Sequence, residues 1–288
     1  MKKIIVYNNW GDTPEYWINS IRKQSPNGKS WGDIKLVSDL KKADFIIVLD
    51  GAGQINRDEF DLFVKKPKIY LQREPEHVQG PIRMNSSKFV KFITYEESHT
   101  FSHWWLDCDY EFLSSLTYNQ ARIQKPICIT TNKAFTHGQR QRLNFFKKID
   151  NLIEIDFYGK NNISSLFRTY KGPPERSPEH PRDKFILRDY NVSFSIENGK
   201  RRNFFTRTQE SMLCWTMPIY WGCPNLEDFF PEFSYRYVNI EEKITPEYLA
   251  HLTRPVEKNE LLALEESRNL ILRKYNFFPF IDNILKDL

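Results

Sequence analysis

A run of cations follows a strand-like segment in the carboxyl-terminal half of the chain. The segment YNVSFSIEN (190–198) ends in Glu197 and Asn198, and the residues after it carry four cations, Lys200, Arg201, Arg202 and Arg207. The run leads into a predicted helix (206–215), whose first backbone N–H groups and dipole favour an anion. The pattern favours a diphosphate at this strand end, against the alternative of a solvated basic turn.

A second pattern is an Asp-x-Asp motif after the apolar residues WWL. One class of metal-dependent transferases uses such a pair of aspartates to hold a manganese diphosphate. Here the pair is Asp107 and Asp109. His99 and His103 precede the motif, and on a helix residues 99, 103 and 107 would share one face. Such a short motif also arises often by chance, and a histidine on a half-apolar helix is usually structural. A metal site at 99–109 is therefore an alternative that EDTA would test.

The composition indicates a globular protein with a sizeable core. The 288 residues are 40% hydrophobic and 27% charged, which excludes a disordered or fibrous chain. The net charge of +5 suits an anionic small ligand as well as nucleic acid. The four cysteines have no close spacing, which favours a reduced, intracellular protein. The first apolar run is too short for a signal peptide or a membrane anchor, so we expect a cytoplasmic enzyme without an integral membrane segment.

Strand-like and helix-like segments alternate along the chain. Short β-branched or aromatic runs are typical of buried parallel strands, and amphipathic stretches between them predict helices. The predicted strands are 2–8, 43–51, 67–75, 125–132, 153–160, 190–198 and 217–222. Helical spacing of Trp17, Ile18 and Ile21 follows the first strand, and a second helix is predicted over 140–152. Four prolines in 171–183 predict a surface loop.

The pattern restarts near residue 125, which predicts two α/β domains, 1–124 and 125–288. Ligand-facing loops at the carboxyl ends of parallel strands would place a substrate cleft between such domains. A binding module without catalysis is a further alternative, because Trp, Tyr and Phe make up 15% of the residues. Most of these aromatics lie in apolar runs such as FITY and FFPF, where core packing is the better explanation.

Several motifs occur in the order of a known family. They are IIVYNNWGD (4–12), KIYLQREP (68–75), Arg142 in RLNFF, FYGK (157–160), and SFSIEN followed by a polar loop, a helix and TMPIYWG. This series resembles the α-1,3/4-fucosyltransferases, glycosyltransferase family 10, and in particular their soluble bacterial members. The resemblance covers nearly the whole chain, and residues 83–120 are its least clear part.

The resemblance implies a GT-B architecture, in which two Rossmann-like domains face a cleft. Domain 1–124 would bind the acceptor and 125–288 the nucleotide sugar, with a C-terminal helix that returns to the first domain. The implied reaction is an inverting transfer of fucose from GDP-fucose to a glycan hydroxyl, in α-1,3 linkage. No cofactor is required, although stimulation by Mn²⁺ or Mg²⁺ stays open, and no nucleic acid is expected as a partner. The acceptor itself is not predicted.

The resemblance also assigns residues to the donor site. Arg142 corresponds to the family's phosphate-binding arginine, Asn198 to the Asn of its FEN motif with Glu197 before it, and Tyr158 and Lys160 to its DxxGK/R turn. We expect Glu197 to order the following loop by accepting backbone N–H groups.

One departure affects the next motif. The family's TEK is TRT (206–208) here, and the stretch from Asn198 to Pro218 looks one residue short. A gap in the loop puts Arg207 in place of the phosphate-contacting Lys, and a gap in the helix puts Thr208 there. We favour the loop, where deletions cost less. In both cases the Glu expected to hold the ribose or the sugar is missing.

Glu74 corresponds to the family's acceptor-side glutamate and is the predicted catalytic base. It ends the predicted strand KIYLQRE, and Pro75 forces it into an extended conformation. An inverting transfer needs a group that takes the proton of the acceptor hydroxyl, and a carboxylate suits this role. Glu76 and His77 are rivals nearby in sequence, and pairing of Glu74 with Arg73 is the structural alternative.

Overall fold

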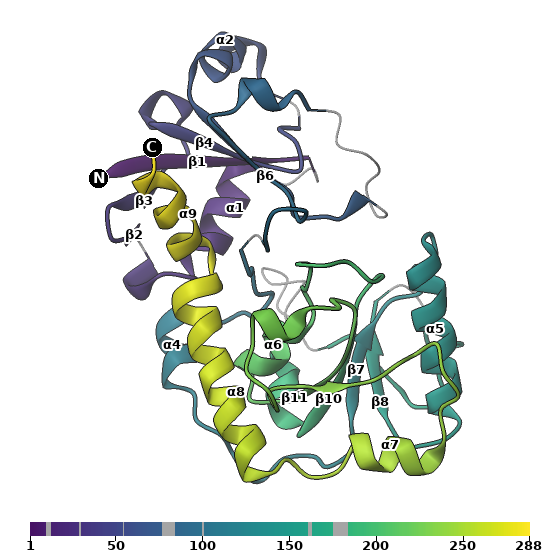
Figure 1. The fold of residues 1–288 in the computed structure, drawn as a ribbon. Coiled ribbons are helices and arrows are strands. Elements are labelled where there is room, and N and C mark those ends of the chain that lie inside the picture. The colour runs from purple at the N-terminus through teal and green to yellow at the C-terminus, as the bar shows by residue number, and fades with distance from the viewer. Residues whose placement is uncertain are drawn as a thin grey trace. The chain divides into compact units, whose positions relative to one another are not determined.

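The computed structural model describes residues 1–9, 13–28, 30–53, 55–76, 84–99, 101–160, 163–174 and 184–288. It divides the chain into two compact units (Figure 1). Unit 1 consists of Met1–His103, Asp109–Ser114 and Leu272–Leu288, and unit 2 of Trp104–Cys108 and Ser115–Ile271. The chain thus changes unit between 103 and 115, earlier than the boundary predicted near 125, and changes back after Ile271.

Unit 1 is built on a six-stranded sheet of order β2-β3-β1-β4-β5-β6. Its strands are parallel except for the pair β2 and β3. The strands are β1 (Lys2–Asn8), β2 (Ser30–Trp31), β3 (Ile34–Leu36), β4 (Phe45–Leu49), β5 (Lys68–Leu71) and β6 (Lys91–Ile93). The helices are α1 (Pro14–Arg22), α2 (Arg57–Lys65), α4 (Tyr110–Ser115) and α9 (Phe277–Lys286).

The predicted strand and helix at the start of the chain are confirmed. The β1 strand covers 2–8, and its apolar residues are buried because β3 and β4 flank it. Thr13 caps α1 by accepting from the N–H of Tyr16, and Trp17 and Ile18 are buried on its inner face. The C-terminal helix α9 belongs to this unit as well, since Phe277 packs edge-on against the Phe101 ring at 5.0 Å.

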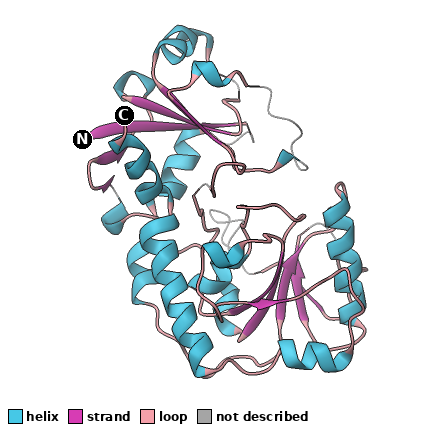
Figure 2. Cartoon of the chain, in the orientation of Figure 1, coloured by secondary structure: helices cyan, strands magenta, loops and turns pink. Residues whose placement is uncertain are grey.

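Unit 2 contains the second sheet, in the order β12-β11-β10-β7-β8-β9. Figure 2 draws the strands in magenta and the helices that pack around them in cyan. The strands of this sheet pair in parallel. The strands are β7 (Ile127–Thr130), β8 (Asp156–Gly159), β9 (Tyr170–Gly172), β10 (Val192–Ile196), β11 (Met217–Trp221) and β12 (Arg236–Tyr237). The helices are α5 (His137–Asp150), α6 (Thr208–Leu213), α7 (Pro246–Leu252) and α8 (Lys258–Leu270).

The strand order of unit 2 reverses between β7 and β10. From β7 the chain continues outward to β8 and β9, and it then returns to build β10, β11 and β12 on the other side. In open parallel sheets a ligand binds in the crevice at such a switch point, outside the carboxyl ends of the strands. The loops that follow β7 and β10, residues 131–136 and 197–207, are therefore the segments to search for a site.

Several predicted boundaries differ from the structure. Helix α5 begins three residues before the predicted start, because Thr136 and Gln139 form a capping box. Strand β5 ends at Leu71 rather than at residue 75, because the N–H groups of Arg73 and Glu74 bond to the Asp50 side chain and leave the ladder. The loop expected at 171–183 begins with the end of β9, and its residues 175–183 lie outside the described residues.

The helix expected to align His99, His103 and Asp107 does not form, since residues 101–109 are irregular. The ring nitrogens of His103 contact Ser20 at 3.1 Å and Gln24 at 2.8 Å, and the ring packs on Trp17. His103 is a structural core residue for this reason.

Among the described residues, none of the helices has the length and apolar character that a bilayer crossing requires. Cys108, Cys128, Cys214 and Cys223 are all buried free thiols.

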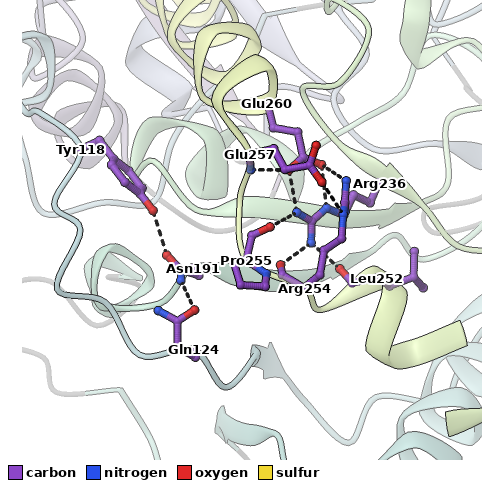
Figure 3. A network of polar contacts seen from close by, with 9 residues as sticks. All are labelled: Tyr118, Gln124, Asn191, Arg236, Leu252, Arg254, Pro255, Glu257 and Glu260. Carbon is purple, nitrogen blue, oxygen red and sulfur yellow. Dashed lines mark hydrogen bonds and ion pairs between the residues drawn. The ribbon is translucent and has the colours of Figure 1, made fainter. Parts of the chain in front are cut away.

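A buried guanidinium fixes the edge of the second sheet. Arg236 in β12 donates to both carboxylate oxygens of Glu260 in α8, at 2.9 and 2.7 Å, as Figure 3 shows. It also donates to the carbonyl groups of Leu252, Arg254 and Pro255. Burial opposes ionisation of Glu260, but the hydrogen bonds from Arg236 and Glu257 and the charges of the two arginines outweigh it and lower its pKa. The network ties the short edge strand to the helix behind it.

A second polar chain in the same view holds the start of β10. The Tyr118 hydroxyl donates to Asn191 at 3.1 Å, and the Asn191 amide donates to Gln124 at 2.6 Å (Figure 3). The segment that enters β7 is thereby fixed to the amino end of the neighbouring strand.

We expect Glu260→Ala to lower the free energy of unfolding by about 3–5 kcal/mol at neutral pH, because it leaves the Arg236 charge buried without its carboxylate. The pKa of Glu260 is lowered in the folded state, so the stabilisation is present above its usual pKa of 4.5 and is lost as the pH falls through the folded value. Urea unfolding at neutral and acidic pH measures both effects. The exposed Glu266 on the same helix is the matched control, and a difference that stays constant with pH would contradict the prediction.

Candidate active site

The carboxylate of Glu197 organises the loop after β10. Its side chain is fully buried, and Oε1 accepts from the backbone N–H groups of Thr206 at 2.6 Å and Arg207 at 2.9 Å. Oε2 accepts from the Thr206 hydroxyl at 3.0 Å and lies 3.9 Å from Nε of Arg207. Burial raises the pKa of Glu197, and the Arg207 charge and the hydrogen bonds oppose that rise. The predicted role of Glu197 in ordering the loop is confirmed.

The Glu197 carboxylate limits which donors are left for an anion at this strand end. It occupies the N–H groups of Thr206 and Arg207, just before α6. Two of the four cations in the loop also pair elsewhere, Lys200 with Glu241 at 2.7 Å and Arg202 with Asp228 at 3.8 Å. A ligand phosphate therefore needs donors other than these, and the anion site at this strand end stays a prediction.

Arg142 lies on α5 and is only 1% exposed. Its Nη1 donates to Oδ1 of Asn198 at 2.6 Å, whereas Nε and Nη2 have no hydrogen-bond partner among the described residues. Burial, and then the charge of Arg207, lower the pKa of Arg142 to about 9. A buried cation with two unused donor atoms is costly unless an acceptor such as a phosphate completes it.

Asn198 brings the two arginines together. Its Oδ1 is 2.6 Å from Arg142 and 3.5 Å from Nη2 of Arg207. Helix α5 begins directly against the same residue, because a Cβ at Gly138 would lie 2.0 Å from the Asn198 carbonyl oxygen. Gly138 is therefore required at this close approach. The sequence predicted Arg142, Asn198 and Arg207 as one site, and the structure collects them at the switch point of the sheet.

Of the two predicted residues of the FYGK turn, Tyr158 has its hydroxyl engaged elsewhere, and the role of Lys160 stays a prediction. The Tyr158 hydroxyl contacts the Tyr190 hydroxyl at 3.2 Å, and Tyr190 donates to Asp156 at 2.9 Å. Asp156 and Tyr190 lie at the amino ends of their strands, whereas Asn198 follows a carboxyl end. Lys160 is exposed after β8. Packing requires a glycine at position 159, because a Cβ there would lie 1.9 Å from the Thr130 carbonyl oxygen.

Glu74 belongs to unit 1 and is half-buried in the segment after β5. Asp50, at the end of β4, accepts from the N–H groups of Arg73 at 2.7 Å and Glu74 at 3.0 Å. The Arg73 guanidinium donates to the Phe101 carbonyl and lies over the Phe101 ring at 4.4 Å. Glu76 is exposed, and His77 lies outside the described residues. The backbone at Glu74 is thus fixed by Asp50.

The sequence did not predict the roles of Asp50 and Gly138. Asp50 precedes Gly51 directly after a strand, which is a turn signal, and it adopts φ 58°. Its carboxylate accepts from the N–H groups of Arg73 and Glu74, which lie 23 and 24 residues away in the sequence, and no local pattern predicts such a contact. Gly138 sits in the first turn of a helix, where a glycine is unfavourable without a packing reason.

The alternative metal site has a different structure from the one expected. Asp109 Oδ1 accepts from the N–H of Phe112 at 2.8 Å at the start of α4, and Asp107 is exposed. Within the described ranges, no group of three or more His, Cys, Asp and Glu side chains could hold a metal ion.

The comparison with protein families identifies the chain. Residues 118–265, slightly more than half of the sequence, match the model of the glycosyltransferase family 10 (fucosyltransferase) C-terminal domain. The chain belongs to this family. It is therefore a glycosyltransferase, and the matched range contains the cluster of Arg142, Asn198 and Arg207. No curated protein sequence matches the chain.

Solved structures with a similar fold agree with the GT-B architecture of this family 10 enzyme. A crystal structure of an alpha1,3-fucosyltransferase matches with 15% identity and a TM-score of 0.56, covering 99% of this chain and 90% of that one. AviGT4, a glycosyltransferase involved in avilamycin A biosynthesis, matches with 8% identity and a TM-score of 0.55, over 99% and 96%. An α,α-trehalose-phosphate synthase from Burkholderia vietnamiensis matches with 9% identity and a TM-score of 0.51, over 84% and 72%.

We expect Arg142→Met to stabilise the ligand-free enzyme by about 1–2 kcal/mol, because it removes a buried cation with two unsatisfied donor atoms. The same change should weaken GDP binding by about tenfold or more and lower turnover by about two orders of magnitude. Thermal unfolding with and without GDP measures both effects. The exposed Lys147 on the same helix is the control for charge alone, and a variant that is less stable and still binds GDP normally would make Arg142 a structural residue.

Proposed function

We propose that this family 10 enzyme transfers fucose from GDP-fucose to a hydroxyl of a glycan, with inversion at the anomeric carbon, and forms an α-1,3 linkage. The observation that carries the proposal is the buried Arg142, whose Nε and Nη2 lack partners beside Arg207 and Asn198. A diphosphate offers the acceptor oxygens that this group needs. The fold similarity to an alpha1,3-fucosyltransferase supports the sugar and the linkage.

The chemistry explains why two arginines are suited to the donor. As the bond to the sugar breaks, positive charge develops on the ring and negative charge on the departing diphosphate. Arg142 and Arg207 would stabilise that negative charge from fixed positions, since Asn198 and Glu197 hold their side chains and backbone. This is the role that a divalent metal ion has in other transferases.

A thermal-shift screen with GDP, UDP, CDP and TDP tests the donor. A ligand that binds only the native state raises the melting temperature. At one hundred times its Kd, it stabilises the native state by about 2.7 kcal/mol. We expect GDP to give the largest shift, and EDTA to leave that shift unchanged. The Arg142→Met variant is the control for binding at the proposed site. Stabilisation by UDP in place of GDP would overturn the assignment of the donor.

We further propose Glu74 as the catalytic base. A base must take the proton from the acceptor hydroxyl as that oxygen attacks the anomeric carbon. Asp50 fixes the backbone of Glu74, while Arg73 is engaged with Phe101, which argues against a simple pair of Glu74 with its neighbour. We propose that unit 1 binds the acceptor, which is an oligosaccharide or another glycan.

Glu74→Gln should lower turnover by about two to four orders of magnitude, because it preserves the shape of the side chain and removes the basic oxygen. GDP binding should survive, since we assign the nucleotide to unit 2. Transfer from GDP-fucose and GDP affinity are measured on the same preparation. Glu76→Gln is the matched control on the exposed neighbour. A Glu74→Gln enzyme with near-parental turnover would place the base elsewhere.

A further inference from the structure

A small pocket in unit 2 adjoins Arg207 and has no assigned role. It is lined by Ile129, Lys184, Ser193, Ser195, Arg207 and Ser211 together with apolar neighbours. Arg207 connects it to the cluster described above, since its Nη2 is 3.5 Å from Asn198. The pocket lies on the α6 side of the sheet, because Ser193 and Ser195 of β10 contact Ser211 of α6.

The three serines are unusual for their place in the fold. Ser193 and Ser195 alternate along a central strand and are 2% and 4% exposed, where apolar residues normally pack against a helix. Phe194 between them points to the opposite face, where it meets Phe145 of α5 at 5.8 Å. Ser211 is 1% exposed in the facing helix. Three buried hydroxyls thus replace a hydrophobic contact between α6 and the sheet.

Their hydrogen bonds leave capacity for a ligand. The Oγ atom of Ser211 lies 2.8 Å from that of Ser193 and 3.1 Å from that of Ser195. Each hydroxyl has one proton to donate and two lone pairs that accept. Mutual bonds can use all three protons but only about half of the lone pairs, so the cluster can still accept a hydrogen bond from a group in the pocket.

The charges around the pocket are balanced. Lys184 pairs with the fully buried Glu210 at 2.9 Å, and Arg207 lies 3.9 Å from the buried Glu197. Each cation at the wall therefore has a carboxylate behind it, which favours a neutral polar ligand over a second anion. The pocket volume of about 20 Å³ has room for one substituent the size of a water molecule rather than for a ring. A single hydroxyl group fits these conditions.

We propose that this pocket binds one ring hydroxyl of the transferred sugar, and that Ser193, Ser195 and Ser211 contribute to donor specificity. The inference rests on the proposed function, in which Arg207 contacts the diphosphate. The sugar ring is bonded directly to that diphosphate, so its hydroxyls are the neutral polar groups nearest to Arg207 on the side of the donor opposite the nucleoside.

The test compares GDP-fucose with GDP on the same variants, by calorimetric titration without acceptor. Ser211→Ala should weaken GDP-fucose by about threefold to tenfold, the value of one neutral hydrogen bond, and leave GDP unchanged. Ser195→Ala, which leaves the helix intact, should have the same effect. Ser267→Ala is the matched control, because Ser267 is a buried helical serine of the same unit that bonds to the Ala263 carbonyl.

Donor analogues that each lack one ring hydroxyl complete the test. One of them should bind the parent enzyme as weakly as GDP-fucose binds Ser211→Ala, and should lose nothing further in that variant, because the two changes remove the same bond. Equal weakening of GDP and GDP-fucose by Ser211→Ala would place the nucleoside in the pocket and overturn the inference, while the proposed function would stand. Independent, additive losses for every analogue would also overturn it. Failure of the parent enzyme to bind either nucleotide would defeat the proposed function itself.

Discussion

The candidate site in unit 2 depends on the buried carboxylate of Glu197. This group takes the first N–H groups before α6, fixes the backbone of Arg207 and lies beside its guanidinium. The next strand has to make room for it, since a Cβ at Gly222 would lie 2.4 Å from Cγ of Glu197. A fully buried charge is stable only with such a set of donors around it. The loop has one conformation because any other would leave this carboxylate unsatisfied.

The same reasoning applied to Arg142 gives the opposite result. Glu197 is satisfied within the described chain, whereas Arg142 is buried with one hydrogen bond and two unused donor atoms. Folding therefore bears a cost at Arg142 that it does not bear at Glu197. Such a loss of stability is typical of a ligand-binding position. The free protein leaves hydrogen-bond donors unsatisfied there, and the bound ligand supplies the acceptors. The contrast separates the residue that builds the loop from the residue that we propose binds the diphosphate.

The sequence predicted the α/β class, most central strands and the grouping of Arg142, Asn198 and Arg207. Short apolar runs define buried strands wherever both neighbours are strands too, as for β1 and β10. The two-residue strands β2 and β12 have no such signal, since pairing with a neighbour alone makes them strands. The helix expected at His99 failed because an i, i+4 spacing of polar residues also occurs by chance, and His103 instead packs in the core of unit 1.

The loop before α6 shows what local patterns leave open at the site. A helix N-terminus with cations before it attracts an anion, and here the Glu197 carboxylate, a side chain from the preceding strand end, occupies two of the N–H groups. Local sequence cannot distinguish a ligand phosphate from an internal carboxylate, because both satisfy the same N–H groups. The tertiary contact that separates them is between α5 and the loop after β10, where Gly138 meets the Asn198 backbone and Arg142 reaches the Asn198 side chain. Ligand-binding capacity thus resides in donors that the fold leaves unused, and finding them requires a complete count of partners for every buried polar atom.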